Sequence, residues 1–249
     1  MPHHPTSLVT GAASGIGKAI ATRLAARGDH VVVLDRDVAA GESAVAGIVA
    51  AGGSAEFRPL DLVDLDAVRG TVDAIAADRG GVDVLINNAG VAVARPFGEY
   101  TARDWALMFD INVRGAFFMQ QAVVAHMRPR GAGRIVNIAS TAAFVSSSTP
   151  ESIYDMTKAA VKQLTISSAV ELAPLGINVN AVAPGTIATD LTLAVLDTPE
   201  KLERAEAKIP ARRLGAPEDI AAAVAFLTSA DADYVHGHVL VVDGGWLLE

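Results

Sequence analysis

The 249-residue sequence contains no cysteine, which excludes disulfide bridges and a thiol nucleophile. No apolar run approaches the length that a membrane span needs. Basic residues are not in excess: the formal net charge is -8, which argues against nucleic acid as the main partner. The six histidines form no cluster with metal-ligand spacing, and the nearest approach, His236-Gly237-His238, is interpreted as a turn before the last strand.

The first residues, Met1 to Pro5, lack the charged and apolar regions of a signal peptide, and we expect a cytoplasmic protein. Hydrophobic residues make up 51% of the chain and charged residues 19%, a composition that supplies a large core and argues against disorder. Because no linker or repeat interrupts the sequence, residues 1–249 are predicted to form one α/β domain.

Short apolar runs alternate with helical stretches along the whole chain. This pattern predicts βαβ units and a parallel, doubly wound sheet. The predicted strands are Leu8–Thr10, Val31–Asp35, Ala55–Pro59, Val82–Ile86, Arg134–Ile138, Asn178–Ala183 and Val239–Val242.

A glycine-rich turn with the spacing G-x-x-x-G-x-G follows the first predicted strand. Glycines there permit a tight bend and let the backbone approach a ligand. The predicted helix that follows stops at Gly28, and its N-terminus would present free N–H groups and a positive dipole end to a pyrophosphate. The turn predicts a cofactor site, with an ordinary glycine-rich turn as the alternative; the residues assigned to it are Gly11, Ser14, Gly15, Ile16 and Gly17.

The second predicted strand ends in an acidic residue, Asp35. A carboxylate at that end can accept hydrogen bonds from both hydroxyls of an adenine ribose and would repel a 2′-phosphate, so it predicts NAD rather than NADP. Arg36 follows directly and weakens the prediction, because a guanidinium can pair with phosphate. The alternative interpretation of Asp35 is an acid that caps the next helix.

Tyr154 and Lys158 lie one helical turn apart and therefore share a face of a predicted helix over residues 152–173. A free tyrosine has a pKa of about 10, and a positive charge nearby favours the phenolate and lowers that pKa. Ser140, upstream of this pair, could donate to an oxygen held beside the tyrosine. The three residues predict a site that moves a proton on or off a C–O group.

These motifs occur together in one order: Thr10-Gly11-x-x-x-Gly15-x-Gly17, Asn87-Asn88-Ala89-Gly90, Asn112, Ser140, Tyr154-x-x-x-Lys158 and Pro184-Gly185. In that order and spacing the sequence resembles the short-chain dehydrogenase/reductase family, from Leu8 to the segment Val242-Asp243-Gly244-Gly245. The resemblance implies a Rossmann-like fold with strand order 3-2-1-4-5-6-7 and a dinucleotide across the carboxyl ends of the strands.

The resemblance also implies roles for individual residues. Asn112 would hold a water that connects to Lys158, which itself would bind the nicotinamide ribose. Asp61 and Leu62 would meet the adenine, although a helix cap is the competing interpretation of Asp61. The segment from Asp190 to Pro210 would form an amphipathic lid over the substrate. Further residues assigned to the cofactor are Asn88, Ala89, Gly90, Pro184, Gly185, Ile187 and Thr189.

The segment between Ser140 and Tyr154 departs from the family pattern. It is slightly longer than usual and lacks the usual glycine, while Thr141 and the run Ser146-Ser147-Ser148 carry further hydroxyls. Ser140 is preferred because Asn137-Ile138-Ala139-Ser140 matches the strand end of the family. The shape of the substrate pocket stays open at this point.

The sequence therefore predicts an NAD-dependent oxidoreductase that interconverts a secondary alcohol and a ketone, with Tyr154 as general acid or base. One alternative is an acyl-thioester ketone reductase; Asp35 and Leu175 argue against it, and its acidic carrier protein would dock on Arg128, Arg130 and Arg134. The other alternative is a nicotinamide-sensing regulator on the same fold, which could dispense with the tyrosine.

The apolar end of the chain, Trp246-Leu247-Leu248, would be exposed at a free terminus. Packing back onto its own chain is one solution, and burial against a partner is the other. The predicted helix over 152–173 is rich in small apolar residues and offers a second flat face. We expect a homotetramer with twofold axes, which the resemblance also implies, in which a neighbouring chain buries the three apolar residues.

Overall fold

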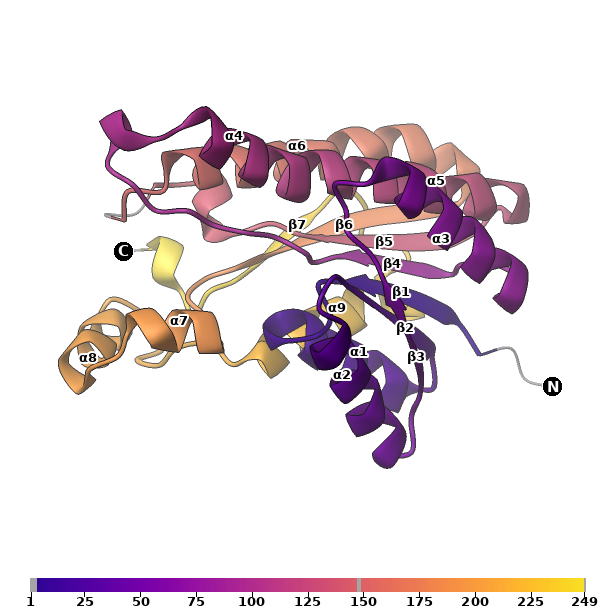
Figure 1. The fold of residues 1–249 in the computed structure, drawn as a ribbon, viewed down its shortest axis with the longest axis horizontal. Helices are drawn as coiled ribbons and strands as arrows, with labels where there is room; N and C mark the ends of the chain where they lie inside the picture. The colour runs from indigo at the N-terminus through magenta and orange to yellow at the C-terminus, as the bar shows by residue number, and fades with distance from the viewer. Residues whose placement is uncertain (1–3, 147–148, 249) are drawn as a thin grey trace.

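The computed structural model describes residues 4–146 and 149–248. Seven strands form one parallel sheet in the order β3-β2-β1-β4-β5-β6-β7, which confirms the predicted fold and strand order (Figure 1). The fourth strand begins at Val84 rather than at the predicted Val82, because Gly80 and Gly81 before it have positive φ and the chain is still turning. The strands are β1 Thr6–Thr10, β2 His30–Asp35, β3 Ser54–Pro59, β4 Val84–Asn87, β5 Gly133–Ile138, β6 Ile177–Pro184 and β7 Val239–Val242.

Helices cover both faces of the sheet, so that the molecule has three layers (Figure 1). Apolar side chains of the sheet and of each helical layer form two separate cores. One face carries α1 (Gly15–Arg27), α2 (Val38–Ala50) and α9 (Pro217–Leu227). The other face carries α3 (Leu65–Arg79), α5 (Ala116–Met127) and α6 (Ser152–Leu172), with α4 (Ala102–Phe109) beside α6.

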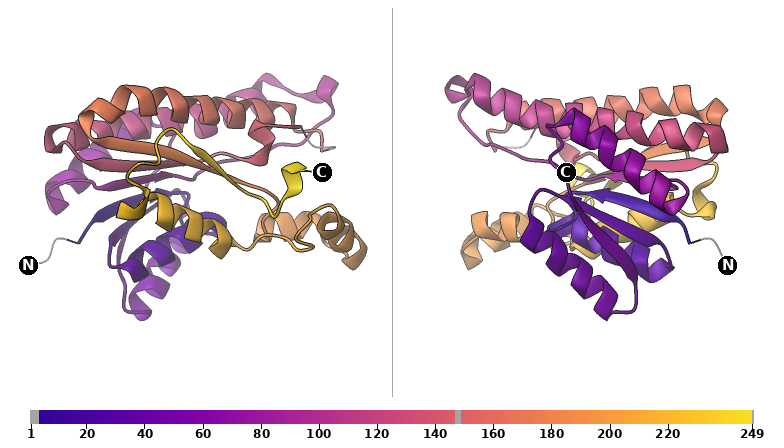
Figure 2. Two further views of the ribbon diagram at one scale, coloured as in Figure 1. Left: turned by 180° about the vertical axis from the view of Figure 1, so that it is seen from behind. Right: turned by 45° about the vertical axis from the view of Figure 1, so that its right-hand side comes forward.

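The strand order reverses at β1, which pairs with β2 on one side and with β4 on the other. Ser7 lies opposite Val31 of β2 and opposite Val84 of β4. The helices after β1 and β4 therefore leave toward opposite faces, and a crevice opens between them at the carboxyl ends of the strands. Two short helices, α7 (Asp190–Val195) and α8 (Pro199–Ala207), lie beyond that end of the sheet (Figure 2).

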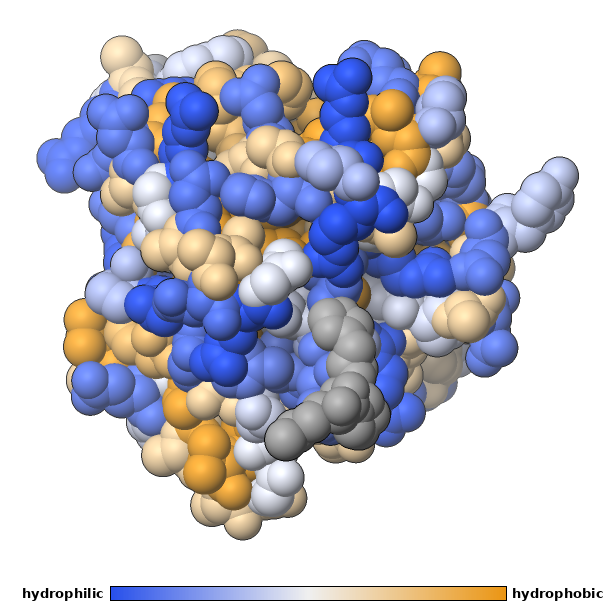
Figure 3. All heavy atoms as spheres, turned by 90° about the vertical axis from the view of Figure 1, so that its right-hand side faces the viewer, coloured by the Kyte–Doolittle hydropathy of each residue, from blue (hydrophilic) through white to orange (hydrophobic). Residues whose placement is uncertain are grey.

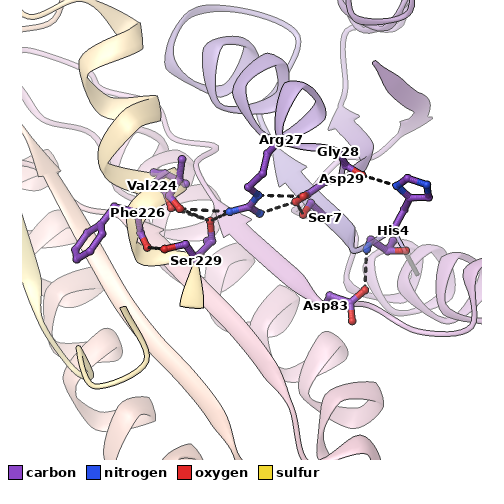
Figure 4. A network of polar contacts seen from close by, with 12 residues as sticks. His4, Ser7, Arg27, Gly28, Asp29, Asp83, Val224, Phe226 and Ser229 are labelled. Atoms are coloured by element: carbon purple, nitrogen blue, oxygen red, sulfur yellow. Dashed lines mark hydrogen bonds and ion pairs between the residues drawn. The ribbon is translucent and has the colours of Figure 1, made fainter. Parts of the chain in front are cut away.

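The opposite end of the sheet, where the strands begin, presents mainly hydrophilic side chains around the N-terminus (Figure 3). An ion pair there joins α1 to the strand that follows it (Figure 4). Arg27 contacts both carboxylate oxygens of Asp29 at 3.0 and 2.6 Å, and Ser7 of β1 donates to the same carboxylate at 2.5 Å. Arg27 also donates to the Thr228 hydroxyl at 2.8 Å, which ties α1 to the end of α9.

No helix among residues 4–146 and 149–248 combines the length and the apolar character that crossing a membrane requires.

Replacing Arg27 by Gln should destabilise the fold. The Asp29 side chain is only 2% exposed, so loss of the guanidinium leaves a buried carboxylate without its counter-ion. Removing one partner of a fully buried pair costs roughly 3–5 kcal/mol, and because Arg27 is partly exposed we expect about 2 kcal/mol in the free energy of unfolding, measured by chemical denaturation. Arg69→Gln is the control: Arg69 is 83% exposed and 4.0 Å from Asp73, and its loss should cost less than about 0.5 kcal/mol. Equal effects of the two substitutions would contradict the prediction.

Candidate active site

A cavity of about 1030 Å³ lies at the carboxyl ends of the strands, between the sheet and the helices α7 and α8. Apart from Asn112, every residue that the sequence assigned to the site lines this cavity. These lining residues are Gly11, Ser14, Gly15, Ile16, Gly17, Asp35, Arg36, Asp61, Leu62, Asn88, Ala89, Gly90, Ser140, Tyr154, Lys158, Pro184, Gly185, Ile187 and Thr189.

The glycine-rich turn lets α1 approach the end of β1 more closely than a side chain would permit. A Cβ atom on Gly17 would lie 2.2 Å from the carbonyl oxygen of Gly11 and 2.4 Å from Nδ2 of Asn88. Gly15 has a φ of 51°, in the left-handed region that favours glycine. The turn therefore leaves backbone, rather than side chains, at the wall of the cavity.

The N-terminus of α1 is left open, in contrast to the helices after β2 and β3. Asp37 caps α2 by accepting from Ala40, and Asp64 caps α3 by accepting from Ala67, each at 3.0 Å. Ser14, the N-cap residue of α1, makes no side-chain hydrogen bond to the helix, and the first turn of the helix holds no acidic residue. Free N–H groups and an unopposed dipole end favour an anion there, so the site fits the pyrophosphate of a dinucleotide.

The residues after β4 hold the glycine-rich turn in place. The Asn88 side chain donates to the carbonyl oxygens of Thr10 and Gly11 at 2.9 and 3.0 Å. The Thr10 hydroxyl in turn accepts from the backbone of Asn88 and Ala89 at 3.0 and 3.1 Å. Thr10 also lines the cavity, although the sequence assigned it no role beyond its place in the motif. The adjacency of β1 and β4 is what brings these segments together.

Neither acid that could have capped a helix does so. Asp35 accepts from the backbone of Ala13 and Asp37, both at 3.1 Å, and the cap of α2 is Asp37. Asp61 accepts from the backbone of Val63 at 3.1 Å, and the cap of α3 is Asp64. The capping interpretations of Asp35 and Asp61 are therefore wrong. Both carboxylates shape their own loops and face the cavity.

Tyr154 and Lys158 project from one face of α6, toward the end of β5. The Lys158 ammonium is buried and donates to the carbonyl oxygen of Ile138 at 2.8 Å, and it lies 5.6 Å from the centre of the Tyr154 ring. Ser140, just after β5, lies beside the Tyr154 hydroxyl and lowers the pKa of that group. Its own Oγ accepts from the backbone of Ala142 at 3.1 Å, which fixes the serine in place. The two hydroxyls thus meet at one point in the cavity.

Burial shifts the pKa values of this pair against the charged forms. Removal from water raises the pKa of Tyr154 to about 12; the Ser140 hydrogen bond opposes the rise, and the charges of Glu151 and Asp155 add to it. Burial lowers the pKa of Lys158 to about 8. The expectation that the tyrosine pKa is lowered is therefore wrong, because desolvation, with the charges of Glu151 and Asp155, raises it. Tyr154 is a neutral phenol at physiological pH.

Asn112 lies in a π-helical turn, Asp110–Gly115, that joins α4 to α5. Asparagine is a poor residue inside a helix because it competes for backbone hydrogen bonds, and here it lies where the helix is irregular. Its side chain accepts from the Val91 backbone and donates to the Val91 carbonyl, both at 2.8 Å, and donates to the Thr157 hydroxyl at 3.0 Å. Asn112 thus joins the segment after β4 to α6 from behind the cavity wall.

A chain of buried side chains joins the strand ends to α6. Asn87 of β4 donates to the side chain of Asn137 in β5 at 2.9 Å, so Asn87 ties neighbouring strands together. Asn137 donates to the Thr165 hydroxyl of α6 at 2.9 Å, and Thr165 donates to the Val161 carbonyl at 2.9 Å. These bonds fix α6 relative to β4 and β5, the strands that precede Gly90 and Ser140.

The segment after β6 closes the far side of the cavity. Gly185 donates its backbone N–H to Val242 at 3.0 Å, and a Cβ atom on it would lie 2.8 Å from the side chain of Asp243. Ile187 is buried, whereas Thr189 caps α7 by accepting from Thr192 at 3.3 Å. The loop between Ser140 and Tyr154, which departs from the family pattern, contributes Thr141, Ala142 and Val145 to the lining of the cavity. Ser147 and Ser148 of this loop lie outside the described residues.

Several lining residues were not named individually from the sequence, although three of them lie in the predicted lid, Asp190 to Pro210. Basic side chains on and just after α8 are one group, and their spacing of three and four residues along a helix was the signal available in the sequence. Trp246 was assigned to a contact between chains, but it lines the cavity of its own chain. The unassigned lining residues used below are Glu151, Asp155, Lys201, Arg204, Lys208 and Trp246.

The three arginines proposed as a docking site for a carrier protein lie near the start of β5, at the opposite end of the sheet from the cavity. Arg130 forms an ion pair with Asp83, and Arg134 forms one with Asp233. Two of the three guanidinium groups are therefore already neutralised within the chain, which argues against this docking surface.

Known proteins match this chain over nearly its whole length. Residues 11–247 match a family model described as enoyl-(acyl carrier protein) reductase. Gluconate 5-dehydrogenase of Gluconobacter oxydans is 40% identical over 239 residues, covering 96% of this chain and 93% of the relative. Cyclopentanol dehydrogenase of a Comamonas species is 39% identical over 239 residues, covering 96% of this chain and 95% of the relative.

Solved structures extend the match to the whole architecture. A gluconate 5-dehydrogenase from Burkholderia cenocepacia, in complex with NADP and tartrate, has a TM-score of 0.93 at 33% identity and covers 98% of this chain and 96% of its own. A short-chain type dehydrogenase/reductase from Mycobacterium marinum has a TM-score of 0.94 at 34% identity with the same coverage, 98% and 96%. With matches of this extent in sequence and structure, the chain belongs to the short-chain dehydrogenase/reductase family.

Proposed function

We propose that this protein is a nicotinamide-dependent oxidoreductase that interconverts a secondary alcohol and a ketone. The observation that carries the proposal is the meeting of the Ser140 and Tyr154 hydroxyls beside a buried lysine, in the same cavity as the open N-terminus of α1. The relatives support it, since the matched Gluconobacter and Comamonas proteins are both dehydrogenases.

The cofactor would lie along the cavity, its pyrophosphate at Ser14–Gly17 and its adenosine between Asp35 and Asp61, while Lys158, Ile187 and Thr189 hold the nicotinamide end. When bound, it would accept or supply the hydride. The protein contributes positions and electrostatics.

Tyr154 would transfer the hydroxyl proton. As a neutral phenol with a pKa of about 12, it is ready to donate a proton to a ketone oxygen. Ser140 would hold that oxygen as negative charge develops on it. Lys158 holds its ammonium against the Ile138 carbonyl, near the tyrosine ring, and the charge would stabilise the phenolate that remains after the proton has left. Through its bonds to Val91 and Thr157, Asn112 would be fixed beside α6. There it would hold the water that connects to Lys158.

The cofactor is proposed to be NAD, on the strength of the Asp35 carboxylate at the adenosine end of the cavity. The NADP bound by the Burkholderia relative supports the opposite choice, in which Arg36 would take the 2′-phosphate. The two side chains are neighbours and both line the cavity, so their balance sets the preference.

The protein is proposed to act as a homotetramer. Leu248 is 87% exposed at the end of the chain, and Val170 on α6 is 74% exposed beside the partly exposed Ile166. Two separate apolar surfaces of this kind suit two kinds of twofold contact.

Tyr154→Phe should abolish turnover and leave cofactor binding intact, because proton transfer needs the hydroxyl and not the ring. Ser140→Ala should lower kcat by about 10²–10³-fold, the usual cost of one lost donor to a developing oxyanion. Steady-state kinetics and cofactor titration test both variants. If Ser140→Ala is mild while Thr141→Ala or Ser146→Ala is severe, the oxygen is held by a different hydroxyl.

The ratio of kcat/KM for NAD to that for NADP on one substrate should be at least about tenfold, or about 1.4 kcal/mol. Asp35→Ala should reduce this ratio by removing the carboxylate that repels the 2′-phosphate. Arg36→Ala is the paired control and should weaken use of NADP alone. Equal or inverted values for the unchanged protein would show that Arg36 dominates.

Light scattering at micromolar concentration should give the mass of four chains. Truncation after Gly245 removes Trp246, Leu247 and Leu248, and it should lower both the mass and the melting temperature. A monomer mass for the full chain would contradict the proposed homotetramer, and so would a truncated chain with unchanged mass and melting temperature.

A further inference from the structure

Charges of opposite sign are segregated on α8 and the residue after it. Basic residues line the cavity at Lys201, Arg204 and Lys208, spaced by three and four residues and therefore on one face of the helix. The acidic residues of the same segment, Glu200, Glu203 and Glu206, do not line it. The helix thus directs positive charge toward the cavity and negative charge away from it.

Two of these basic side chains have no partner within the described part of the chain. Lys201 is engaged: its ammonium contacts Asp197 at 2.6 Å and the Val195 carbonyl at 3.4 Å. Arg204 and Lys208 make no ion pair or side-chain hydrogen bond with any residue among 4–146 and 149–248. A guanidinium and an ammonium at the wall of a cavity, with their charges uncompensated, suit an anionic ligand.

The facing wall of the same cavity has the opposite chemistry. Glu151 and Asp155 flank Tyr154, and burial together with the Asp155 charge raises the pKa of Glu151. Carboxyl groups there can accept hydrogen bonds from hydroxyl groups of a ligand. Apolar Leu191 and Val195 of α7 complete the enclosure. A ligand that binds both the cations of α8 and the carboxyl groups of α6 has a negative charge at one end and several hydroxyl groups along its length.

Resting on the function proposed above, we propose that Arg204 and Lys208 bind a carboxylate of the substrate, and that the preferred substrates are polyhydroxylated carboxylic acids. Two other partners for these cations exist within the cavity. The first is a phosphate of the cofactor, and the second is a carboxylate of the lining, Asp190 of α7 or the pair Glu151 and Asp155, which the cations could meet without any ligand. The experiment separates the three.

D-Gluconate and D-glucitol are suitable probes because they differ only in a carboxylate that is replaced by a hydroxymethyl group. Each is titrated calorimetrically into the full-length protein with NADH, and in parallel with NADPH, at saturation, so that the alcohol binds without being oxidised. The unchanged protein should bind gluconate at least about tenfold more tightly than glucitol. Arg204→Gln and Lys208→Gln should each weaken gluconate binding about tenfold and leave glucitol binding within about twofold. Glu203→Gln, on the outward face of the same helix, should change neither.

Several outcomes overturn the assignment. The first is failure of gluconate to bind the unchanged protein. The second is an equal loss of affinity for gluconate and for glucitol in Arg204→Gln. That result would mean that Arg204 pairs with Glu151 and Asp155 and not with the substrate. Weaker binding of NAD or NADP alone to the variants would place the cofactor's phosphate, and not the substrate, on these cations.

Oxidation of cyclopentanol, a neutral alcohol, separates this proposal from the general function. Turnover of cyclopentanol without discrimination between gluconate and glucitol would leave the oxidoreductase standing and refute the carboxylate site. Gluconate binding that depends on Arg204, without turnover of any alcohol, would support the carboxylate site and refute the oxidoreductase.

Discussion

The buried hydrogen-bonded chain Asn87–Asn137–Thr165 is the constraint on which the proposed site depends. It crosses from β4 to β5 and on to α6, and each of these elements carries one part of the site at a short distance along the chain. The segment after β4 holds the glycine-rich turn, the end of β5 carries Ser140, and α6 carries the tyrosine and lysine. Polar bonds in a water-free interior are directional, so they set the position of α6 more narrowly than apolar packing alone. The meeting of two hydroxyls follows from that alignment.

Local patterns in the sequence were sufficient for the strands and for the glycine-rich turn, because both depend on near neighbours. The insertion of β4 beside β1 was predicted only through the family resemblance, since no local signal encodes which strands pair. The pKa of Tyr154 was predicted in the wrong direction: spacing places a lysine nearby, but burial of the ring depends on how the whole cavity closes. The roles of Asp37 and Asp64 as caps became clear only when the helix starts were known to the residue.

The distribution of charge in the cavity contrasts with that of the whole chain. The protein carries a net charge of -8, whereas the charged side chains that line the cavity balance. Five are basic and five are acidic: Arg36, Lys158, Lys201, Arg204 and Lys208 against Asp35, Asp61, Glu151, Asp155 and Asp190. Within this balanced lining, the basic groups of α8 and the open end of α1 are the places that attract anions, while the acidic remainder of the protein repels them. An acidic protein whose cleft holds basic groups at a few fixed positions is therefore selective for where an anion binds, and salt should weaken that selectivity.

The pairing of β1 with β4 also bears on how the chain folds. Ser7 and Val84, which lie side by side in the sheet, are separated by all of β2 and β3 and their helices. Closing so long a loop costs conformational entropy before the contact stabilises anything, and contacts of this kind form slowly. On the ribosome, β1 to β3 emerge before β4, so the glycine-rich turn acquires its Asn88 support only after β4 has been synthesised. The nascent chain can therefore bind a dinucleotide at this turn only after β4 has been synthesised and has paired with β1.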